Sequence, residues 1–159
     1  MGKIITLESL QQEITKVRES DKKIVLVGGC FDIVHVGHIK FLKEAKKKGG
    51  CLFLLLESDE TVKKIKGQNR PYFPQEERAE VLSSIKYVDF VLMMPPVTKD
   101  GDYDKLVSQI KPDFIAVTEN DPILTKKKNQ VKMVGGKLKI IPFTKTFSSS
   151  QLAKLLGIE

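Results

Sequence analysis

Short apolar runs alternate with amphipathic stretches along almost the whole chain. The first stretch, residues 4–18, places Leu7, Leu10, Ile14 and Val17 on one stripe at helical spacing, which predicts a leading amphipathic helix. Five later runs are apolar without a break and predict buried strands at 23–28, 51–56, 88–93, 114–117 and 138–141. The stretches between and after these runs predict helices at 38–48, 59–66, 74–85, 104–110, 123–134 and 149–156.

This alternation of strands and helices predicts an α/β fold. Strands that are apolar throughout are typical of a parallel sheet covered on both faces. We therefore expect a small, doubly wound, Rossmann-like fold, with five parallel strands and helices on both faces. A chain of 159 residues suits one domain, so we expect a single domain over 1–159 that includes the leading helix within 1–20. Ligands of such folds bind at the carboxyl ends of the strands.

The composition is that of an ordinary globular protein, with 41% hydrophobic and 30% charged residues. No apolar run approaches the roughly 20 residues that a membrane-spanning helix needs, and residues 1–7 lack the layout of a secretory signal. These features predict a cytoplasmic protein with no membrane partner. Cys30 and Cys51 form no CxxC pair, so we expect free, buried thiols in a reducing compartment.

The net charge is +7 and comes almost entirely from lysine, which suits a polyanionic ligand. That ligand is either a nucleotide or a nucleic acid. With 7% aromatic residues and no tryptophan, the chain lacks the stacking platforms of a nucleic-acid binder, so we expect no nucleic-acid partner. The lysine runs at 46–48 and 126–128 are interpreted as solvated helix faces.

The first strand leads into a turn that holds both histidines of the chain, His35 and His38. Their spacing puts them on one face if the helix has already begun. The glycines of this turn let backbone approach a phosphate closely, and a helix start adds amide donors and a positive dipole. A metal site is the alternative, but only Asp32 stands nearby as a further ligand. The residues favour phosphate binding without excluding a metal.

At this point the sequence resembles a known family. The run Gly29-Cys30-Phe31-Asp32-x-x-His35-x-Gly37-His38 is similar to the signature of the cytidylyltransferase-like nucleotidyltransferase superfamily. Further likeness is found in Lys66-Gly67-x-x-Arg70-Pro71 with Pro74 and Arg78, and in Ser148-Ser149-Ser150, which stands where the family has Ser-Thr-Thr. The resemblance covers nearly the whole chain.

Within the superfamily, the leading helix and the Gly-Cys-Phe-Asp turn resemble the heptose 1-phosphate adenylyltransferase domain most, and glycerol-3-phosphate cytidylyltransferase next. The sequence departs from both. Gly28 stands where the heptose enzymes have Asn, and Glu119-Asn120-Asp121 replaces their Gly-Gly-Asp, so only Asp121 matches. The cytidylyltransferase has Arg before its last motif, where this chain has Phe143 or Lys145 nearby. The base and the acceptor therefore stay open.

The resemblance implies in-line attack of an acceptor phosphate on the α-phosphorus of a nucleoside triphosphate, with release of pyrophosphate. Such transfer needs positioning and charge neutralisation more than a protein nucleophile. ATP with a sugar 1-phosphate is favoured, and CTP with glycerol 3-phosphate is the alternative. Mg²⁺ is expected to bridge phosphate oxygens without protein ligands of its own. A homodimer is compatible with the sequence.

The resemblance also implies roles for individual residues. The expected catalytic residues are His35, His38 and Lys66. The expected nucleotide-binding residues are Gly29, Cys30, Phe31, Gly37, Arg78, Glu119, Asp121, Phe147, Ser148 and Ser149. The expected acceptor-binding residues are Asp32, Lys64 and Arg70.

Several of these residues also have an ordinary structural interpretation. Arg78 suits a surface ion pair with Glu77 or Glu80, and Lys64 suits solvated surface. Ser148 suits a helix N-cap. Cys30 is interpreted as a packed small residue, because nothing near it in the sequence is arranged as a base. For the whole chain, a nucleotide-sensing module without turnover stays open beside the enzyme.

Overall fold

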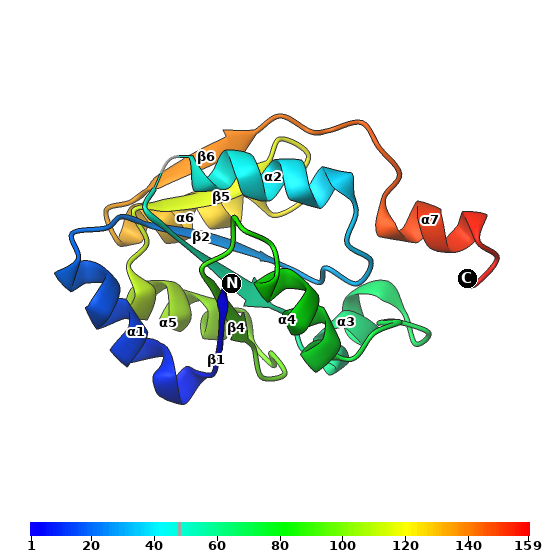
Figure 1. Cartoon of the computed structure of the whole chain (residues 1–159), viewed down its shortest axis with the longest axis horizontal. Helices are drawn as coiled ribbons and strands as arrows, with labels where there is room; N and C mark the ends of the chain where they lie inside the picture. The colour runs from blue at the N-terminus through cyan, green and yellow to red at the C-terminus, as the bar shows by residue number, and fades with distance from the viewer. Residues whose placement is uncertain (48) are drawn as a thin grey trace.

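The computed structural model describes residues 1–47 and 49–159 as a six-stranded parallel sheet with helices around it (Figure 1). The strands are β1 (Lys3–Ile5), β2 (Ile24–Gly29), β3 (Cys51–Leu56), β4 (Phe90–Met93), β5 (Phe114–Thr118) and β6 (Lys137–Ile141). They lie in the order β1-β4-β3-β2-β5-β6. The chain therefore winds outward from β2 in one direction and restarts at β5 in the other. The switch point between β2 and β5 is where such sheets bind ligands.

The sheet has one strand more than the five predicted. Residues 3–5, assigned above to the leading helix, form β1, and Ile4 pairs with Val91 of β4. The helix begins only at Leu7, after Thr6 as its N-cap. Three residues do not make a strand by themselves, because most of their stability comes from pairing with a neighbour far along the chain. The hydrophobic spacing of this short segment suits a helix equally well.

The helices are α1 (Leu7–Glu19), α2 (Val36–Lys46), α3 (Asp59–Lys66), α4 (Gln75–Ser83), α5 (Asp100–Ile110), α6 (Leu124–Met133) and α7 (Ser149–Leu155). Each of these helices was predicted; α3 has the predicted ends, and the ends of the others are shifted. The α5 helix begins four residues earlier than predicted, because Asp102 accepts hydrogen bonds from the backbone N–H of Thr98 and of Lys99. The predicted end of the second helix at Lys48, and the last lysine of the run 46–48, lie outside the described residues.

Two apolar cores cover the two faces of the sheet. Ile24 and Leu26 of β2 belong to one core, with side chains from α1, α5 and α6. Val25 and Val27 of the same strand belong to the other core, with side chains from α2 and α4. The alternation along β2 is the two-residue period of a strand with both faces buried. The prediction of a parallel sheet covered on both faces is therefore confirmed.

The α7 helix lies at one end of the molecule, joined to β6 by a segment without regular structure (Figure 1). It is attached there by polar contacts: Ser149 Oγ donates to the carbonyl of Ile33, and Tyr72 Oη donates to the carbonyl of Ile158. The last helix thus returns to the turn after β2. Within the described residues, no helix has the length and apolar character needed to span a membrane.

Candidate active site

The turn after β2 brings the predicted motif to the carboxyl edge of the sheet. Phe31 takes a positive φ of 46° and is buried, which reverses the chain after Gly29. A Cβ on Gly29 would lie 3.0 Å from the Phe31 ring. A Cβ on Gly37 would lie 2.8 Å from Cγ2 of Thr146. Both glycines therefore permit close packing, and Gly37 lets the segment before α7 pass beside the start of α2.

The two histidines cap α2 reciprocally. His35 is the N-cap, and its Nδ1 accepts a hydrogen bond from the backbone N–H of Gly37 at 3.1 Å. The backbone N–H of His35 donates in turn to Nδ1 of His38 at 3.3 Å. The two ring centroids are 3.9 Å apart. The helix begins two residues earlier than predicted because a histidine supplies the cap that serine or aspartate usually supplies.

Burial determines the protonation state of the pair, and the capping bonds determine which ring nitrogen carries the proton. Burial lowers the pKa of His35, and burial together with the charge of His35 lowers the pKa of His38 to about 4. Both imidazoles are therefore neutral near pH 7. A neutral imidazole whose Nδ1 accepts a hydrogen bond carries its proton on Nε2. Each ring thus has an Nε2–H that its capping bond does not use and that can be donated to a phosphate oxygen.

Two of the expected acceptor-binding residues, Asp32 and Arg70, bind each other. Arg70 Nε lies 2.6 Å from Asp32 Oδ2, and both side chains are only 1% exposed. Asp32 Oδ1 accepts from the backbone N–H of Tyr72, and Arg70 Nη1 also pairs with Glu159. This pair ties the loop 67–74 and the C-terminal residues to the turn after β2. Direct contact of these two side chains with an acceptor stays a prediction.

Arg78 is buried, so its interpretation as a surface ion-pair partner of Glu77 or Glu80 is wrong. Its guanidinium donates to the carbonyls of Phe73, Cys30 and Glu57 and to Asp59 Oδ1. It points inward because the loops after β2 and β3 present unpaired carbonyls that need donors. Arg78 thus joins the ends of two neighbouring strands, and its expected contact with nucleotide stays a prediction.

The two predicted lysines of α3 differ in their surroundings. Lys64 pairs with Glu60 across one turn of the exposed helix surface, as expected for solvated surface. Lys66, also exposed, is near enough to Cys30 for its charge to act on that thiol. Burial nevertheless raises the pKa of Cys30, so the thiol is protonated near pH 7. This agrees with its interpretation as a packed residue.

The residues predicted before and within α7 lie at the helix start. Ser148 Oγ accepts from the backbone N–H of Gln151, which confirms the N-cap interpretation. Ser149 donates to the carbonyl of Ile33, and Phe147 is exposed. The start of α7 therefore lies against the histidine turn.

On the far side of the switch point, the segment after β5 holds Glu119 and Asp121. Glu119 Oε1 accepts from the backbone N–H of Phe143, which links the ends of β5 and β6. Asp121 accepts from the backbone N–H of Ile123 and pairs with Lys127 at 2.7 Å. These contacts shape the turn that replaces Gly-Gly-Asp. The prediction that Glu119 and Asp121 bind the nucleotide stays untested.

Two residues near the site were not predicted, Glu57 and Tyr103. Glu57 follows β3 directly, and the hydroxyl of Tyr103 in α5 donates to its Oε1 at 2.6 Å. An acidic residue at the end of a wholly apolar strand was the available signal for Glu57. No sequence pattern pointed to Tyr103, which is far away along the chain.

Among the described residues, no group of three or more His, Cys, Asp or Glu side chains could hold a metal ion.

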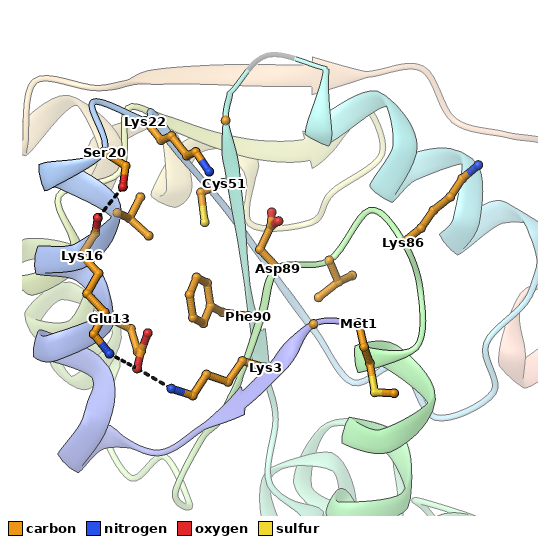
Figure 2. Close-up of a pocket in the computed structure, with 14 residues that line it drawn as sticks. Met1, Lys3, Glu13, Lys16, Ser20, Lys22, Cys51, Lys86, Asp89 and Phe90 are labelled. Atoms are coloured by element: carbon orange, nitrogen blue, oxygen red, sulfur yellow. Dashed lines mark hydrogen bonds and ion pairs between the residues drawn. The ribbon is translucent and has the colours of Figure 1, made fainter.

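A cavity of about 450 Å³ lies at the amino ends of the strands, opposite the carboxyl edge that holds the histidine turn (Figure 2). It is bordered by α1 and by the amino ends of β1, β3 and β4, and Figure 2 shows Glu13 between Lys3 and Lys16 at its wall. Asp89, also on its wall, pairs with Lys46. The acidic groups of this cavity are thus matched by lysines, and the histidine pair lies at the other end of the strands.

Comparison with known proteins shows the family of this chain. The family model described as cytidylyltransferase-like matches residues 26–155. Bifunctional protein HldE from Desulfatibacillum aliphaticivorans is 33% identical over 154 residues, which are 95% of this chain and 30% of that protein. Bifunctional protein HldE from Campylobacter jejuni subsp. jejuni serotype O:6 is 38% identical over 151 residues, 92% of this chain and 30% of that protein.

Among solved structures, the lipopolysaccharide core biosynthesis protein from Thermoplasma volcanium is similar with a TM-score of 0.63 and 29% identity. The match covers 79% of this chain and 99% of that one. The chain belongs to the cytidylyltransferase-like family. It spans about 30% of the length of the curated relatives that it matches.

Proposed function

We propose that this chain transfers a nucleotidyl group from a nucleoside triphosphate to the phosphate of a small acceptor. The observation that carries the proposal is the reciprocal cap of His35 and His38. This cap holds two neutral imidazoles at the carboxyl edge of the sheet, and the capping bonds leave the Nε2–H of each ring unused. Preorganised donors of this kind stabilise charge that develops on phosphate oxygens in the transition state.

In the proposed reaction, an oxygen of the acceptor phosphate attacks the α-phosphorus in line with the leaving group. The bond from the α-phosphorus to the α,β-bridging oxygen breaks, and pyrophosphate leaves with its electron pair. The histidines donate hydrogen bonds to phosphate oxygens, and the exposed Lys66 neutralises phosphate charge. When bound to the triphosphate, Mg²⁺ would supply further neutralisation of phosphate charge.

Within this reaction we propose ATP as donor and a sugar 1-phosphate as acceptor. The resemblance of the leading segment and of Gly29-Cys30-Phe31-Asp32 to the heptose 1-phosphate adenylyltransferase domain supports this choice. The identity of 33% and 38% to proteins named HldE along most of the chain is consistent with it. CTP is the competing donor, since Glu119-Asn120 replaces the two glycines of the heptose enzymes next to the expected base.

The test is pyrophosphate release by the purified chain with Mg²⁺. ATP and CTP are each combined with heptose 1-phosphate, with glycerol 3-phosphate and with no acceptor. Acceptor-dependent release is the expected result, and kcat/KM for the two nucleotides decides the base. A clear preference for CTP contradicts the choice of ATP alone. Nucleotide binding without release in any combination favours the sensing module over the enzyme.

A further inference from the structure

Glu57 lies at the carboxyl edge of the sheet, directly after β3 and beside the motif strand β2. Its backbone N–H donates to the carbonyl of Gly29 at 3.2 Å, and its own carbonyl accepts from Arg78 at 2.9 Å. Its position next to the phosphate-binding turn is therefore held by hydrogen bonds on both sides of the residue.

Only one of the two carboxylate oxygens of Glu57 has a hydrogen-bond partner. The residue is 8% exposed, and its Oε1 accepts the hydroxyl of Tyr103 at 2.6 Å. Its Oε2 is the one buried side-chain nitrogen or oxygen without a hydrogen-bond partner in residues 1–47 and 49–159. Buried polar atoms are nearly always paired, because an unmade hydrogen bond costs the full desolvation of the group. An orphaned carboxylate oxygen beside an active site therefore needs a functional explanation.

The cations near Glu57 are bonded to other groups. Lys127 and Arg78 act electrostatically on Glu57, but Lys127 pairs with Asp121 and Arg78 pairs with Asp59, each at 2.7 Å. Burial raises the pKa of Glu57 by more than the Tyr103 hydrogen bond and these two charges lower it. The free oxygen is thus an acceptor that the protein itself does not use.

The chemistry of the carboxylate restricts what can bind there. A carboxylate accepts hydrogen bonds and repels phosphate, so the partner is a neutral donor in the non-phosphate part of a substrate. Sugar hydroxyls are such donors. In dinucleotide-binding folds, an acidic residue beyond the phosphate-binding turn holds ribose hydroxyls. Glu57 has the comparable place here, at the end of the strand beside the phosphate turn.

We propose that Oε2 of Glu57 accepts a hydrogen bond from a sugar hydroxyl of a bound substrate, with Tyr103 as its positioning residue. The nucleotide ribose and a sugar acceptor share this chemistry. The inference rests on the proposed function and adds a specificity-determining residue to it. Because the oxygen is buried in this structure, binding includes a local movement that exposes it.

The experiment compares wild type, Glu57→Gln and the control Glu60→Gln, which changes an exposed glutamate of α3. One panel measures binding of the favoured nucleotide and of its 2′-deoxy and 3′-deoxy forms. A second panel measures kcat/KM for the favoured sugar 1-phosphate and its single-deoxy analogues. The glutamine amide can still accept from Tyr103, but it replaces the free acceptor by a donor.

Wild type and Glu60→Gln should prefer one hydroxyl-bearing ligand over its deoxy form by roughly tenfold to hundredfold, as expected for a hydrogen bond to a charged group. Glu57→Gln should lose that preference to within about threefold. The panel in which the loss occurs identifies ribose or acceptor sugar as the source. An unchanged preference in both panels overturns the inference.

The melting temperature without ligand separates this role from a structural one. Removing a buried charge whose Oε2 has no hydrogen-bond partner should leave Glu57→Gln at least as stable as wild type at pH 8. A clearly lower melting temperature would show that the carboxylate is structural and would overturn the inference. If wild type neither binds nucleotide nor releases pyrophosphate, the proposed function itself fails, and the assignment of Glu57 to a sugar fails with it.

Discussion

Two sets of nitrogen donors lie around the same turn after β2, and they differ in what remains available. The arginines Arg70 and Arg78 are buried, and they donate hydrogen bonds to carboxylates, carbonyls and the Ser150 hydroxyl of the protein. The histidines His35 and His38 use Nδ1 for the cap and keep Nε2–H. A conspicuous cation in a family motif can therefore hold the site together, while a neutral ring supplies the donor to the ligand.

The largest effect is expected from removing a buried arginine. Arg70→Ala leaves the carboxylate of Asp32 buried without its partner, which should lower the free energy of unfolding by about 3–5 kcal/mol. Urea denaturation measures this. Arg18→Ala is the matched control, because Arg18 pairs with Asp113 on the surface and is 37% exposed. The control should lose no more than about 1 kcal/mol. Equal losses would mean that burial does not distinguish the two pairs.

Substitution of a histidine of this turn is expected to reduce activity while the protein stays folded. His38→Ala removes one preorganised donor and should lower kcat by roughly 10²–10³, with an unchanged circular dichroism spectrum. Lys40→Ala, an exposed change on the same helix, is the control and should keep wild-type kcat. A folded His38→Ala variant with wild-type pyrophosphate release would remove His38 from the catalytic residues.

The two exposed lysines of α3 test whether nearness to the histidine turn separates a binding cation from a surface one. Lys66→Ala removes a charge near Cys30 and should reduce kcat/KM about tenfold to hundredfold, the range for one hydrogen bond to a charged group. Lys64→Ala removes only a helical surface pair and should change kcat/KM by less than about twofold. Equal effects of the two substitutions would contradict the assignment of Lys66 to the phosphates.

The pH dependence of stability tests the neutral state of His38. The folded pKa of His38 is about 4, below its value of 6.5 in the unfolded chain. The unfolded state therefore binds more protons between these values, and the stability that neutral His38 contributes is lost as pH falls from 6.5 towards 4. The slope is at most about 1.4 kcal/mol per pH unit. Urea titrations of wild type and His38→Ala should converge towards pH 4, and parallel curves would contradict the lowered pKa.

The α/β class, the helices to within a few residues of their ends, and the place of the histidine turn were predictable from the order of the amino acids. These features depend on spacing along the chain: apolar runs, the three-residue interval of the histidines, and the hydroxyl of Ser148 at a helix start. Contacts between residues three or four positions apart are local, so their pattern is visible in the order of the amino acids.

The partners of residues far apart along the chain could be known only from the folded structure. The strand β1 exists because it pairs with β4, and Arg78 points inward because carbonyls after β2 and β3 converge on it. The carboxylate of Glu57 meets Tyr103 only when α5 packs on the sheet. These contacts join residues far apart along the chain, and no local spacing encodes which distant group will lie opposite. Burial and pairing of charges therefore had to be observed in the folded chain.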